Sequence, residues 1–118
     1  MGDATVMEHL LAATDADLVS FEMDVGWVTA ACVSPLDLIA AHPGRFRQAH
    51  VKVLLAAPPD TSLDQTPADV GAGLIDWPSL LPELKTNGVA EFYVEREPPF
   101  TDDPMAAVKR NHDYVARM

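Results

Sequence analysis

Three short apolar segments alternate with helix-like segments along the chain, and this alternation constrains the fold more than any other feature. The apolar segments span Leu18–Val25, Phe46–Leu55 and Val89–Glu95. They are rich in Val, Phe, Tyr or Leu, as strands buried in a sheet are. Strands that alternate with helices form βα units, whose crossovers make neighbouring strands parallel. The sequence therefore predicts an α/β fold with three parallel strands.

The segments around these strands are typical of short helices, with residues at their ends that start or stop a helix. Ser34 and Asp76 each precede a first turn that contains proline, and Pro43–Gly44 and Asn87–Gly88 follow helix-like runs. Such residues favour helix starts and helix ends, respectively. The expected helices are Val6–Thr14, Pro35–Ala41, Pro78–Thr86 and Pro104–Met118.

One long irregular segment, Ala57–Asp76, follows the second strand and contains three prolines and two glycines. Loops of this length in compact domains are either functional or merely mobile. Both interpretations stay open from the sequence.

The chain has 118 residues, which is enough for a single domain at most. A three-stranded parallel sheet leaves two unpaired edges, and a closed barrel of eight βα units needs about 250 residues. We therefore expect either a fragment of a larger barrel or a chain that completes its sheet by association.

Composition excludes several functional classes. Eight basic against 18 acidic residues give a formal net charge of −10, which opposes binding to nucleic acid. No apolar stretch approaches the roughly 20 residues of a membrane span, so we expect a soluble, cytoplasmic protein without a membrane partner. The single cysteine, Cys32, excludes an internal disulfide and is expected to be a small buried residue.

Strand alternation places polar side chains on one face of all three strands. Asp24, His50 and Glu95 share that face near the strands' carboxyl ends, where sites of parallel α/β folds collect. Two carboxylates and an imidazole suit a divalent ion such as Mn²⁺, Co²⁺, Mg²⁺ or Zn²⁺. The alternative is that Asp24 caps a turn, His50 is a hydrogen-bonded interior histidine and Glu95 is a surface acid.

Four motifs occur in order along the chain, and together they resemble the C-terminal part of the sugar phosphate isomerase/epimerase family, the xylose-isomerase-like TIM barrels. The motifs are SFEMDVGWV (Ser20–Val28), PGRFRQAHVK (Pro43–Lys52), VGAGLIDWPSLL (Val70–Leu81) and FYVEREPP (Phe92–Pro99). The resemblance implies that residues 1–118 form one partial TIM-barrel domain. Its strands would be the sixth, seventh and eighth of the family barrel.

The resemblance also implies roles for individual residues. Asp24, His50 and Glu95 match three of the family's four metal ligands, and Glu95 matches one of its two acid/base glutamates. The earlier glutamate has no counterpart here. Lys52 is interpreted as a contact for a sugar oxygen or phosphate, or else as a solvated lysine. Trp27 stands where relatives often have a substrate-binding histidine, and is either a wall of the sugar pocket or a core residue.

The function implied is a metal-dependent sugar or sugar-phosphate isomerase/epimerase that transfers a proton through an enediolate. Because one ligand and one glutamate are missing, we expect the isolated chain to be inactive and to need a homo-oligomer or a complementing barrel fragment. The alternative is a non-catalytic, self-associating βα module that retains the inherited polar face. Whether the chain is an enzyme by itself is therefore left open.

Overall fold

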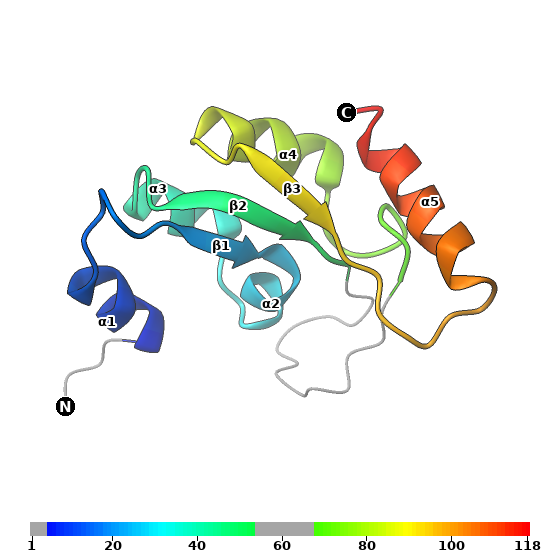
Figure 1. Cartoon of the computed structure of the whole chain (residues 1–118), viewed down its shortest axis with the longest axis horizontal. Coiled ribbons are helices and arrows are strands. Elements are labelled where there is room, and N and C mark those ends of the chain that lie inside the picture. Colours follow the sequence, from blue (N-terminus) through cyan, green and yellow to red (C-terminus); the bar gives the residue numbers. More distant parts are fainter. Residues whose placement is uncertain (1–4, 54–67) are drawn as a thin grey trace.

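The computed structural model describes residues 5–53 and 68–118. Three strands form one parallel sheet in the order β1-β2-β3, as the alternation predicts (Figure 1). The helices are α1 (Val6–Ala13), α2 (Val25–Ala30), α3 (Pro35–Ala41), α4 (Trp77–Thr86) and α5 (Pro104–Val115), and the strands are β1 (Phe21–Asp24), β2 (Phe46–Val51) and β3 (Glu91–Val94).

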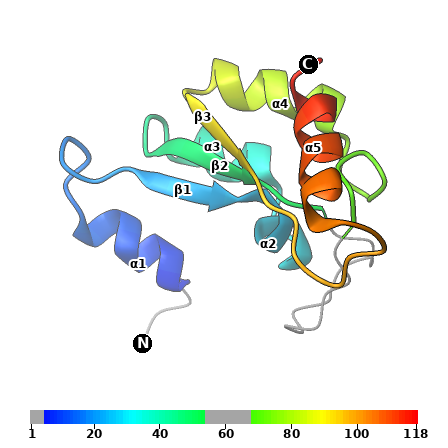
Figure 2. The ribbon, with the colours of Figure 1, turned by 45° about the vertical axis from the view of Figure 1, so that its right-hand side comes forward.

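One face of the sheet is apolar and is packed with helices. Met23, Ala49 and Val51 from the strands are fully buried and join a single core cluster with side chains of α3 and α4, such as Ile39 and Leu81. In Figure 2, α3 lies behind β2, α4 lies above the strands and α5 stands beside the end of β3. The helices therefore leave the other face of the strands for polar side chains.

The register aligns the carboxyl ends of the strands. Asp24 of β1 pairs with His50 of β2, and His50 pairs with Tyr93 of β3. The backbone N–H of Glu95 donates to the carbonyl of Val51 at 3.2 Å, which continues the pairing past the end of β3. This register places Asp24, His50 and Tyr93 level with one another, and Glu95 follows two residues beyond Tyr93.

Helix α2 was not predicted, and the first strand is correspondingly shorter than the expected Leu18–Val25. Val25, Gly26 and Thr29 have low helix propensity, so the sequence carries no helical signal there. Asp24 nevertheless caps the helix, because its Oδ1 accepts a hydrogen bond from the N–H of Trp27 at 2.9 Å. Burial of Val25 and Ala30 then outweighs the low propensity.

The expected helix starts are confirmed, since Ser34 and Asp76 are the N-caps of α3 and α4. Gly88 has a φ of +102°, which favours glycine at that helix end. The prediction for Cys32 was wrong: this residue is exposed. Leu54–Leu55 of the expected second strand and residues 57–67 of the expected loop lie outside the described residues.

Among residues 5–53 and 68–118, no helix is long and apolar enough to cross a membrane. A cytoplasmic location stays a prediction.

Candidate metal centre

Asp24, His50 and Glu95 converge at the carboxyl end of the sheet. One potential ligand atom from each lies within 4.8 Å of the other two. His50 Nδ1 is 3.7 Å from Asp24 Oδ2 and 3.4 Å from Glu95 Oε2. One ion with bonds near 2 Å can bridge atoms at these separations. The structure thus brings together the three residues that strand alternation placed on one face.

The two carboxylate oxygens of Asp24 make different contacts. Oδ1 accepts the capping hydrogen bond of α2, and Oδ2 faces His50 and the ammonium of Lys52, which is 3.9 Å away. The capping role and the ligand role, which the sequence left as alternatives, are therefore compatible in one side chain.

Glu95 carries a buried oxygen that has no hydrogen-bond partner among the described residues. This atom is Oε2, which points toward His50 Nδ1 and Lys52 Nζ at 3.4 Å each. Most buried polar atoms in proteins have a partner, and an exception calls for an explanation such as an ion. The donor set of two carboxylate oxygens and an imidazole nitrogen fits a divalent cation.

Lys52 lies directly beside the three converging side chains and is buried. Its side chain is only 6% exposed, and its Nζ lies 3.0 Å from Glu97 Oε2. Burial by itself would lower the pKa of Lys52, but the hydrogen bond with Glu97 and the charges of Asp24 and Glu95 outweigh burial and raise the pKa. The structure therefore excludes the solvated-lysine interpretation and keeps the ammonium charged.

Trp27, on α2, lies beside Lys52. The Lys52 Nζ is 5.1 Å from the centre of the Trp27 ring, within the range of a cation–π interaction. The ring therefore borders the candidate site through Lys52.

Two further acids contact the site, and neither was given its role from the sequence. Glu22 Oε1 lies 2.8 Å from His50 Nε2, and Glu97 pairs with Lys52. Glu22 lies two residues before Asp24 on β1, and Glu97 lies two residues after Glu95, beyond the end of β3. That spacing is the signal from which their proximity could have been predicted.

A polar network on the other side of Glu95 anchors the chain after β3. The Arg96 side chain is 6% exposed, and its Nε donates to Asp69 Oδ1 at 3.2 Å. Asp69 also accepts from Arg110 Nε at 3.0 Å and from Asn111 Nδ2 at 3.2 Å. Asp69 thus joins the segment before α4 to α5 and to the residue next to Glu95.

Replacing Asp69 by asparagine is expected to destabilise the chain by roughly 1–2 kcal/mol at pH 7, because charge-assisted hydrogen bonds are lost at a partly exposed site. Burial acts to raise the pKa of Asp69, but the hydrogen bonds from Arg110, Asn111 and Arg96 outweigh it, so the pKa is lowered. The stabilisation is therefore present above the unfolded-state pKa of about 3.9 and is lost as pH falls through the lower folded-state value.

Urea unfolding followed by circular dichroism measures this difference at pH 7 and at acid pH. The gap between wild type and Asp69→Asn should start to narrow below about pH 4. Asp113→Asn, which removes an exposed pair with Lys109, is the control and should have the smaller effect. A gap that is independent of pH would contradict the role given to Asp69.

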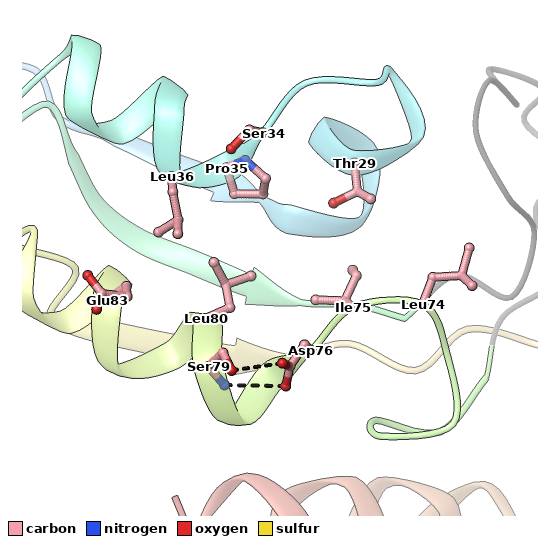
Figure 3. Close-up of a pocket in the computed structure, with 10 residues that line it drawn as sticks. All are labelled: Thr29, Ser34, Pro35, Leu36, Leu74, Ile75, Asp76, Ser79, Leu80 and Glu83. Atoms are coloured by element: carbon pink, nitrogen blue, oxygen red, sulfur yellow. Dashed lines mark hydrogen bonds between the residues drawn. The ribbon is translucent and has the colours of Figure 1, made fainter.

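A separate groove lies on the helical side of the sheet. Its volume is about 410 Å³, and Leu36 and Leu80 face each other across it from α3 and α4 (Figure 3). The Asp76–Ser79 hydrogen bonds at the start of α4 border this groove. None of the three converging residues lines it, so the groove is distinct from the candidate metal centre.

Comparison with known proteins supports the fold. No family model matches the chain, and no curated protein matches it. Two solved structures, each described as a sugar phosphate isomerase/epimerase from Parabacteroides distasonis, do match. One has a TM-score of 0.71 and 24% identity over 97% of this chain, and the other has 0.74 and 23% over 98%.

This chain spans 36% and 37% of the lengths of those two structures. The resemblance noted from the four motifs is therefore confirmed at the level of the fold. The chain is a partial, TIM-barrel-like α/β unit of three parallel strands with flanking helices, similar to about a third of a sugar phosphate isomerase/epimerase structure.

Proposed function

We propose that this chain supplies three metal ligands and one acid/base carboxylate to a sugar or sugar-phosphate isomerase/epimerase. The observation that carries the proposal is the convergence of Asp24, His50 and Glu95 around Oε2 of Glu95, a buried atom with no hydrogen-bond partner among the described residues. The likeness to solved sugar phosphate isomerase/epimerase structures supports the same reaction class.

Asp24, His50 and Glu95 would hold a divalent ion, with Mn²⁺, Co²⁺, Mg²⁺ and Zn²⁺ as the candidates. When bound, such an ion would supply Lewis-acid stabilisation of the negative charge on an enediolate. Asp24 Oδ2 and Glu95 Oε2 both lie within 4 Å of Nδ1 of His50, at 3.7 Å and 3.4 Å.

The acid/base step is assigned to Glu95. Isomerisation and epimerisation of a ketose require removal of a proton from the carbon beside the carbonyl and its return. A carboxylate at the carboxyl end of a barrel strand is placed to perform that transfer. The second acid/base group and the fourth ligand would come from outside these 118 residues.

Lys52 and Trp27 are proposed to bind the substrate. The Lys52 ammonium is held charged between Glu97, Glu95 and Asp24, and the Trp27 ring borders it. A sugar oxygen or a phosphate would replace part of this carboxylate shell, and the ring would wall one side of the sugar.

The proposed partner is a second copy of the chain or another barrel fragment. In the described sheet, β1 and β3 are edge strands, and unpaired edges of a parallel sheet favour association. The same observation favours the second candidate function, a non-catalytic self-associating module.

Light scattering across a concentration series is expected to show a mass above 12.8 kDa that rises with protein concentration. The physical reason is that pairing at β1 and β3 satisfies exposed backbone groups only when another chain is present. A species that stays at monomer mass and unfolds cooperatively at every concentration would contradict the association.

The proposed function is tested by titrating the chain with Mn²⁺ and following the free-ion signal by electron paramagnetic resonance. We expect one ion per chain, and a changed bound-ion spectrum on adding a hydroxamate that mimics an enediolate. Comparison of the hydroxamate with its phosphorylated form separates a sugar from a sugar-phosphate site. Absence of stoichiometric binding to the chain, alone and in its associated form, would overturn the proposal.

Catalysis is tested with a ketose in deuterated water. The chain alone should not convert the ketose into its epimer above background, because returning the proton to the opposite face needs the second acid/base glutamate. Deuterium that enters the carbon beside the carbonyl and disappears in Glu95→Gln would show that Glu95 alone forms the enediolate, and epimer formed by the chain alone would make it a working enzyme by itself.

A further inference from the structure

The two ring nitrogens of His50 face different carboxylates. Nε2 lies 2.8 Å from Glu22 Oε1, whereas Nδ1 lies 3.4 Å from Glu95 Oε2 and 3.7 Å from Asp24 Oδ2. Only the first separation falls in the usual range of an N–H···O hydrogen bond, about 2.7–3.2 Å. A neutral imidazole carries one ring proton, and the contact with Glu22 is the better place for it.

We infer that Glu22 is a positioning residue that holds the Nε2 proton of His50 and so leaves the Nδ1 lone pair facing Asp24 and Glu95. The effect that this positioning of His50 has on metal affinity rests on the proposed function. The inference adds a residue that is neither a ligand nor an acid/base group to the site.

The strands explain how Glu22 reaches its position. Glu22 pairs in register with Gln48, two residues before His50 on the same face of β2, so its side chain needs only to lean along the sheet. The Tyr93 ring, on β3, packs against the His50 ring in a T-shaped pair, with ring centres 6.4 Å apart. His50 is thus held between β1 and β3.

The same geometry argues against Glu22 as a direct ligand of an ion bound at Nδ1. Nε2 is on the far side of the imidazole from the lone pair of Nδ1, and Glu22 Oε1 lies beside Nε2. Outer carboxylates that accept the second ring N–H of a ligand histidine orient the ring, and their loss typically lowers metal affinity about 10–100-fold.

The first test needs no metal. Nitrogen-15 NMR of the metal-free chain at pH 8, above the ordinary histidine pKa of about 6.5, reports which ring nitrogen of His50 is protonated. His50→Gln identifies the signal. We expect the proton on Nε2 in the wild type and a mixture of tautomers in Glu22→Ala. A proton on Nδ1 in the wild type would overturn the inference.

The second test separates positioning from the simple loss of a charge near a cation. Glu22→Ala should weaken Mn²⁺ binding about 10–100-fold, whereas Glu22→Gln keeps an acceptor oxygen and should restore most of the affinity. If glutamine is as damaging as alanine, only the charge matters and the inference fails. Glu91→Ala, which removes an acid from β3 outside the cluster, is the matched control.

The two proposals fail in distinguishable ways. If the wild-type chain binds no Mn²⁺ but its His50 carries the proton on Nε2, the proposed function is contradicted and the positioning of His50 by Glu22 still stands. If the wild-type chain binds Mn²⁺ but His50 of the metal-free chain carries the proton on Nδ1, the inference about Glu22 is contradicted and the proposed function still stands.

Discussion

Replacing Glu95 by glutamine is expected to lower the affinity for Mn²⁺ by more than roughly 100-fold, because loss of a ligand costs more than the 10–100-fold typical of an outer partner. The same change should leave the fold of the metal-free chain intact. Glu22, Asp24, Glu95 and Glu97 surround His50 and Lys52, so removing one carboxylate relieves repulsion among the others while Lys52 keeps Glu97.

The measurement is thermal or urea unfolding with and without metal. At a free Mn²⁺ concentration 100 times the dissociation constant, binding to the native state alone stabilises the wild type by about 2.7 kcal/mol. Glu95→Gln should show almost none of this increment at the same concentration. Glu91→Gln, at the first residue of β3, the strand that Glu95 follows, should retain it.

If the stabilisation by Mn²⁺ is retained in Glu95→Gln but lost in Glu91→Gln, the ion binds at the other end of β3. Equal loss in both variants would indicate nonspecific binding to an acidic chain.

The order of strands and helices could be predicted because both signals are local. Strand segments are short apolar runs, and Ser34, Asp76 and Gly88 mark helix ends through their own side chains or lack of one. Helix α2 could not be predicted in this way, since its stability comes from the Asp24 cap and from burial against the sheet. The cap is a local signal, but the burial that outweighs the low helix propensity depends on tertiary packing.

The candidate site was predictable to the extent that strand alternation fixes which side chains share a face. Asp24, His50 and Glu95 follow from that rule and from the motifs that contain them. The two-residue spacing brings Glu22 and Glu97 near the site, but the rule gives no atom-to-atom distances, so the specific contacts of Glu22 with His50 and of Glu97 with Lys52 could not be predicted. Nor does it reveal the shift of register between Phe21 and Glu22, which lies just before the site.

Trp77→Ala is expected to have the largest effect on stability. Trp77 is the first residue of α4 and is fully buried in the core cluster. Removal of a buried tryptophan side chain costs about 3–5 kcal/mol through lost transfer energy and the cavity left behind. Small domains have a total stability of only about 5–15 kcal/mol, so this variant should lose a large part of its free energy of unfolding.

Trp77→Phe separates the contribution of volume from that of the indole N–H, because Nε1 of Trp77 is buried without a hydrogen-bond partner in the described part of the chain. A buried unpaired donor costs about 1–3 kcal/mol, and phenylalanine removes that cost while it loses part of the packing. The two effects oppose each other, so Trp77→Phe should cost less than half as much as Trp77→Ala. Urea unfolding followed by circular dichroism compares them. Equal destabilisation by both variants would mean that the N–H has a partner and that the fit of the indole in the core is what matters.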